Sequence, residues 1–144
     1  MKKIFKGLFI FLFLVLLSGC AKDYKAITST EFIEKMNLEK GYLVNTHTPI
    51  YDSSITKSTS VNGNDIQFLF FEFENAKDAK NYVKKSYKDL GSYKYKDYGS
   101  YVVVKNTKGR YFYLIQIDNT VLSGNTDTKS NKKEINRIFK KLGY

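Results

Sequence analysis

Residues 65–74 read Asp-Ile-Gln-Phe-Leu-Phe-Phe-Glu-Phe-Glu, the most apolar run in the chain after residue 20. Side chains alternate between the two faces of a β-strand, so a strand here carries apolar groups on both faces. The two sets are Ile66, Phe68 and Phe70 on one face and Leu69, Phe71 and Phe73 on the other. Because both faces must be covered, we predict that this strand lies in the middle of a sheet.

Three segments around this strand have the periodicity of amphipathic helices. The first is predicted at 29–40, and the second begins at Asn75 and runs to about residue 90. The third begins near Asn131, where Glu134 follows three residues later, as in a capping box. Each helix has one apolar stripe, so each is expected to cover a sheet.

Strand-forming residues also dominate 42–47, 98–105 and 110–117, and the last two segments are joined by hairpin-turn residues. Residues 48–63 are mostly Ser, Thr, Asn and Gly, which predicts a long loop with at most a short edge strand. A further short strand is expected at 121–123.

This order of elements predicts an α+β fold. We expect a two-layer sandwich, with a mainly antiparallel sheet of four to five strands and three helices mostly on one face. The strand order cannot be derived from the pattern.

The chain begins with the three parts of a secretory signal peptide. Lys2, Lys3 and Lys6 precede the apolar run 8–17, and small residues follow it. The run is shorter than the roughly 20 residues that a helix needs to cross a bilayer. We predict a signal peptide at 1–19, a tether at 20–28 and a single domain at 29–144.

Leu17-Ser18-Gly19-Cys20 resembles the lipobox of bacterial lipoproteins, in which the cysteine receives a diacylglyceryl group and becomes the new amino terminus. The alternative is a plain signal peptide that is cut near Cys20. The rest of the chain is similar to small lipoproteins of low-GC Gram-positive bacteria, for which no activity is known. The similar stretches are Phe-Glu-Phe-Glu-Asn at 71–75, Ile-Asp-Asn-Thr at 117–120 and Lys-Lys-Leu-Gly-Tyr at 140–144. The resemblance implies lipidation at Cys20 and a place on the outer face of the bacterial cell membrane.

The chain is basic, with a formal net charge of +10 that falls to +7 when the three lysines of residues 1–19 are removed. A positive surface favours anionic partners, and salt weakens such binding. The alternative is compositional bias, because 22 of the cations are lysine and only two are arginine. If the second and third helices share one sheet face, their lysines form one cationic patch. The patch would comprise Lys77, Lys80, Lys84, Lys85, Lys88, Lys132, Lys133, Lys140 and Lys141.

Few residues suggest catalysis. His47 is the only histidine and Cys20 the only cysteine, which leaves too few ligands for a zinc site of the His/Cys kinds. Glu72 and Glu74 lie two residues apart on one strand face, so they could act as an acid–base pair in a small hydrolase. The alternative is that these two glutamates mark the point where the strand leaves the core.

Lysine and tyrosine alternate from residue 93 to residue 101. Such a segment could form an aromatic and cationic surface for sugars, bases or phosphates. An exposed edge strand guarded by lysine against aggregation has the same pattern.

The sequence therefore predicts a lipid-anchored, extracytoplasmic, non-enzymatic domain that binds a protein or an anionic envelope component. The alternatives are the Glu72 and Glu74 hydrolase and an interaction subunit of a membrane assembly. We expect no metal or other cofactor, no nucleic-acid partner and a monomeric chain.

Overall fold

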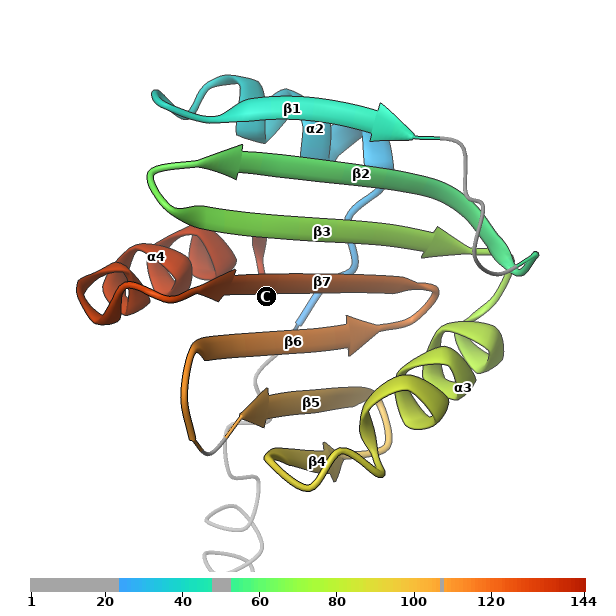
Figure 1. Ribbon diagram of the computed structural model, residues 1–144. Coiled ribbons are helices and arrows are strands. Elements are labelled where there is room, and N and C mark those ends of the chain that lie inside the picture. Colours follow the sequence, from blue (N-terminus) through green and yellow to red (C-terminus); the bar gives the residue numbers. More distant parts are fainter. Residues whose placement is uncertain (1–23, 48–52, 107) are drawn as a thin grey trace, which may run out of the picture.

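The computed structural model describes residues 24–47, 53–106 and 108–144. Its centre is one open, antiparallel sheet of seven strands in the order β1-β2-β3-β7-β6-β5-β4 (Figure 1). The strands are β1 (Leu43–His47), β2 (Ile55–Gly63), β3 (Ile66–Phe73), β4 (Tyr93–Asp97), β5 (Tyr101–Asn106), β6 (Tyr111–Ile117) and β7 (Thr120–Thr126). The helices are α2 (Ser29–Asn37), α3 (Ala76–Tyr87), the short 3₁₀ turn η1 (Lys129–Asn131) and α4 (Lys132–Leu142). The α+β class is confirmed.

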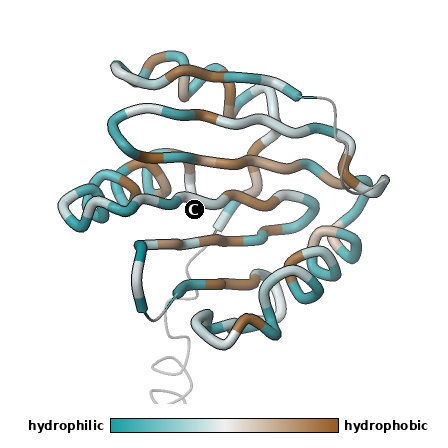
Figure 2. The backbone as a smooth tube through the Cα atoms, in the orientation of Figure 1, coloured by the Kyte–Doolittle hydropathy of each residue, from teal (hydrophilic) through white to brown (hydrophobic). Residues whose placement is uncertain are grey.

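The apolar stretch forms β3, which lies inside the sheet between β2 and β7, as predicted. Phe68 and Phe70 are fully buried on one face, and Phe73 is buried on the other. The Phe70 ring stacks on that of Phe32 from α2, with ring centroids 4.7 Å apart. In Figure 2 the hydrophobic residues concentrate on the strands, while the helices and turns carry most of the hydrophilic ones.

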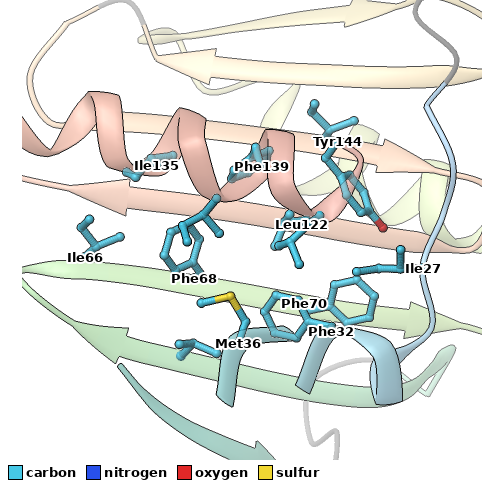
Figure 3. Packing of buried hydrophobic residues seen from close by; sticks show 14 of the residues in the cluster. Ile27, Phe32, Met36, Ile66, Phe68, Phe70, Leu122, Ile135, Phe139 and Tyr144 are labelled. Carbon is cyan, nitrogen blue, oxygen red and sulfur yellow. The ribbon is translucent and has the colours of Figure 1, made fainter. Parts of the chain in front are cut away.

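Helices cover both faces of the sheet, so the predicted two-layer arrangement is wrong. Helices α2 and α4 share one core with Phe68 and Phe70, which Figure 3 shows from the helix side. Helix α3 packs on the opposite face through Ala79 and Val83, and Figure 1 shows it on the other side of the strands from α4. The physical reason is that the strands expose a second apolar face, which one layer of helices cannot cover. Its buried strand residues are Ile55, Phe73, Val102, Val104, Phe112, Leu114 and Val121.

The sheet has seven strands instead of four to five, because polar segments also pair. Strand β2 lies in the segment that was predicted as a loop, and it pairs with β3 from residue 55 to 63 and with β1 from residue 58 to 62. Its Val61 is fully buried, while residues 48–52 lie outside the described chain. Strand β7 is longer than the expected 121–123 and lies at the centre of the sheet.

Helix α4 packs closely over β7 because residue 124 is glycine. A Cβ atom there would lie 2.9 Å from Ile135 Cγ2 and 3.1 Å from Phe68 Cε1. The first distance is shorter than real Cβ contacts and the second is tighter than most, so a larger residue would force Ile135 or Phe68 to shift.

The helix starts are partly as predicted. Helix α2 has a capping box between Thr28 and Glu31, and the Asn75 side chain caps α3 by accepting a bond from the Asp78 N–H. The predicted capping box at α4 is wrong, since Asn131 makes no side-chain cap bond. Its side-chain amide instead donates to the Asn64 carbonyl oxygen at 2.7 Å.

The described part of the predicted tether packs on the domain. Ile27 is buried, and the Tyr24 ring contacts that of Tyr101 with centroids 4.7 Å apart. In Figure 1 this blue segment runs behind the strands before it enters α2. The predicted signal peptide and Cys20 lie outside the described residues. Within the part of the chain that the structure describes, no helix is long and apolar enough to span a membrane.

Candidate functional site

The lysines of α3 and α4 do not form one patch, because these two helices lie on opposite faces of the sheet. Several also have partners within the protein. Lys80 Nζ lies 2.8 Å from Asp97 Oδ2, and Lys141 pairs with Glu39. Lys132 Nζ lies 5.4 Å from the centroid of the Tyr111 ring. The predicted shared surface is therefore wrong.

Glu72 has a structural role at the start of α2. Its Oε2 atom accepts a hydrogen bond from the Ser29 backbone N–H at 2.9 Å, a stabilising position for a carboxylate. Glu74 lies just beyond β3 and is exposed. Neither glutamate lines the pockets described below.

His47 lies on the edge strand β1, and its Nε2 atom is 2.8 Å from Ser60 Oγ. Among the described residues, no group of three or more His, Cys, Asp or Glu side chains could hold a metal ion.

In the β4 part of the alternating segment 93–101, the tyrosines and the lysines lie on opposite faces of the sheet. On β4, Tyr93 and Tyr95 pack toward α3, and the Tyr93 ring contacts that of Phe112 at 5.2 Å. Alternation places Lys94 and Lys96 on the opposite face, the face that also carries α2 and α4. The tyrosines and lysines of β4 therefore cannot form one surface by themselves.

Tyrosines from outside β4 accompany these lysines instead: Tyr24, Tyr98 in the turn after β4, Tyr101 on β5 and Tyr113 on β6. Together they surround a pocket of about 250 Å³ at the β4 side of the sheet. We call this group the Tyr/Lys surface. It consists of Tyr24, Lys94, Lys96, Tyr98, Tyr101, Val103, Lys105 and Tyr113.

The aromatic rings of the Tyr/Lys surface contact one another. Tyr101 lies between two rings, with Tyr24 edge-on at 4.7 Å and Tyr98 stacked at 4.7 Å and 18°. Aromatic contacts of this kind favour fixed ring positions. Tyr98 is 52% exposed, so the outer face of this stack meets solvent.

The lysines of this surface lie together, and two of them face each other across a strand pair. Lys94 is directly opposite Lys105 across the β4–β5 pair, and Lys96 is opposite Val103. Like charges directly opposite one another in a sheet are destabilising. Within the described ranges, none of the three lysines has an ion-pair partner. The neighbouring Asp97 belongs to the other face and pairs with Lys80.

The Tyr113 hydroxyl is neutral at ordinary pH. Burial, followed by the neighbouring tyrosines, raises the pKa of Tyr113 to about 12. Tyr24 and Tyr113 also line an adjoining hollow of about 580 Å³ beside the end of α4, together with Lys140. Among the described residues, no Asp or Glu side chain lines either hollow.

This arrangement can bind an anion. Three ammonium groups supply positive charge, and phenol hydroxyls donate hydrogen bonds to oxygen atoms. The aromatic rings add apolar and cation–π contacts. The described side chains that line the two hollows include no pairing of a nucleophile with a base.

Comparisons with protein-family models, with curated proteins and with solved structures find no match.

Sequence reasoning found part of this surface. The alternation at 93–101 identified Lys94, Lys96, Tyr98 and Tyr101. It missed Tyr24, which was assigned to the tether, and it missed Lys105 and Tyr113. The available signal was the alternation within 101–105 and 111–117, but using it requires the β4–β5–β6 register.

Proposed function

We propose that the protein is a lipid-anchored, non-enzymatic binding domain on the outer face of a bacterial cell membrane, and that the Tyr/Lys surface holds an anionic envelope component. The observation that carries this proposal is the group of three exposed lysines without carboxylate partners around a tyrosine-lined pocket. A bound anion would relieve the repulsion between Lys94 and Lys105.

Charge distribution supports a local site over a general basic character. Elsewhere several cations meet acids, as Arg110 does with Asp127 and Arg137 with Glu39. At the Tyr/Lys surface positive charge accumulates, and no Asp or Glu within the described part of the chain lines the pocket. Glu72, the residue on which the hydrolase alternative depends, is engaged at the start of α2.

The test is binding of the full chain to inorganic polyphosphate, a soluble polyanion, by calorimetry at low and near-physiological salt. The variant replaces Lys94, Lys96 and Lys105 with Gln. The control replaces Lys77, Lys84 and Lys88 of α3 with Gln, which removes the same charge from the other face. Each lysine near an anionic surface contributes about 1 kcal/mol, so the first variant should bind about a hundredfold more weakly at low salt.

The control variant should bind nearly as well as the unchanged chain, and added salt should weaken binding of both. Equal losses in the two variants would contradict the proposal, because they would assign the binding to total charge. Absence of binding by the unchanged chain at low salt would also overturn it.

A further inference from the structure

We infer that the anionic component is the head-group layer of the membrane that carries the anchor, so that the domain rests on the bilayer with its Tyr/Lys surface toward the lipid. This inference rests on the proposed function, including the lipid on Cys20. It adds the orientation of the domain on the membrane, and it names lipid head groups as the source of the bound anion.

Cys20 lies close in sequence to the Tyr/Lys surface. Tyr24 belongs to the Tyr/Lys surface, and Cys20 precedes it by four residues. Four residues span at most about 14 Å, whatever path they take. A lipid on Cys20 therefore holds this surface close to the head groups and leaves the opposite face of the sheet farther away.

The residue types of the Tyr/Lys surface are those that suit a lipid head-group layer. Lysines can extend along apolar surface and place their ammonium groups among phosphates. Tyrosine is enriched at membrane–water interfaces, where its ring meets apolar groups and its hydroxyl meets water. The surface presents both, with Tyr98 stacked on Tyr101 and exposed on its outer side. A carboxylate would be repelled by anionic lipid, and no Asp or Glu of residues 24–47, 53–106 and 108–144 lines the pocket.

A lipid on Cys20 also raises the effective concentration of head groups around the nearby lysines. Separate lysine contacts with head groups are weak, but a tether of a few residues makes each contact intramolecular. Attraction to an anionic leaflet decays within a Debye length, about 8 Å at physiological salt, so only groups held near the surface benefit. The anchor satisfies this condition for Lys94, Lys96 and Lys105 better than for lysines on α3.

The experiment measures which face approaches the bilayer. The full chain is produced in a host that lipidates such proteins, and mass spectrometry confirms the lipid on Cys20. It is reconstituted into vesicles with nitroxide-labelled head groups, made of phosphatidylcholine alone or mixed with phosphatidylglycerol. A fluorophore is placed at Ser100→Cys, in the turn between Tyr98 and Tyr101, or at Asn62→Cys, on β2 at the far side of the sheet. Both positions are exposed.

On phosphatidylglycerol vesicles the Ser100 label should be quenched severalfold more than the Asn62 label. The difference should shrink on pure phosphatidylcholine and when Lys94, Lys96 and Lys105 are changed to Gln. Melting curves of each labelled variant exclude misfolding as the cause.

Equal quenching at the two positions would overturn the orientation. If polyphosphate still bound through the three lysines, the proposed function would stand, with a wall polymer or free phosphate as the source of the anion. If the two labels were quenched equally and polyphosphate binding did not depend on the three lysines, both proposals would be overturned. A mature chain without lipid on Cys20 would also overturn this inference.

Discussion

Two groups of cations lie on the same side of the sheet, and they differ in their partners. On α4, Arg137 Nη2 lies 2.6 Å from Glu39 Oε2 and 2.7 Å from Glu134 Oε1, and Lys141 joins the same Glu39 carboxylate. On β4 and β5, Lys94 and Lys105 face each other, and no described Asp or Glu side chain lines their pocket. The first group is paired, and the second is not.

The paired group joins two helices. Glu39 follows α2, and its bonds to α4 connect two segments that are far apart in the sequence. Its side chain is only 11% exposed, and the hydrogen bonds from Arg137 and Lys141 lower the pKa of Glu39 to about 2. These contacts stabilise the fold. The lysines of the Tyr/Lys surface contribute no such contact, which leaves them available to a ligand.

The largest expected effect comes from Phe139→Ala, which would disturb both regions. Phe139 is buried on α4 and contacts the rings of Phe68, Tyr113 and Tyr144. Removing a buried phenyl ring should lower the free energy of unfolding by about 3–5 kcal/mol. Chemical denaturation measures the loss.

The control for this variant is Leu38→Ala, because Leu38 is 77% exposed and should have little effect. A loss below about 1 kcal/mol for Phe139→Ala would show that α4 does not pack on the sheet as described.

An intermediate effect is expected from Glu39→Gln, which breaks only the paired group. It should lower the free energy of unfolding by about 1 kcal/mol, since Arg137 and Lys141 are partly exposed. The folded-state pKa of Glu39 is about 2, below the ordinary value of 4.5, so its contribution is present above that value and is lost as pH falls toward 2.

Stability measured against pH should therefore show a shallower acid loss in Glu39→Gln than in the unchanged chain. The matched control is Glu34→Gln on α2, which removes a carboxylate outside the paired group. Identical pH profiles for the two variants would argue against the Glu39 ion pairs.

The smallest effect should have the opposite sign. Lys105→Glu places a carboxylate opposite Lys94 and replaces repulsion with attraction, so the free energy of unfolding should rise by about 0.2–1 kcal/mol. The same change should weaken polyphosphate binding. A variant that is more stable but binds less would sharpen the distinction between the two groups.

The control is Lys88→Glu at the end of α3, which makes the same change of charge away from the surface. If Lys105→Glu destabilised the protein, the β4–β5 register given above would be wrong.

Local patterns allowed several elements to be predicted from the sequence. The run at 65–74 determined an inner strand, because alternation along one chain fixes which side chains share a face. The apolar periodicity near the C-terminus likewise determined α4, and the polar turn at 106–109 determined that β5 and β6 form a hairpin. These features depend on neighbours within a few residues.

Only the tertiary structure decided the remaining features, since each depends on contacts between distant segments. The polar segment of β2 becomes a strand because β1 and β3 pair with both of its edges. Helix α3 lies opposite α2 and α4 because its strands offer a second apolar face. The Tyr/Lys surface exists because strand pairing brings Lys105 opposite Lys94, and because packing brings Tyr24 to Tyr101. Register and packing of this kind have no local signature, so the sequence predicted the residues of β4 but not the site that they complete.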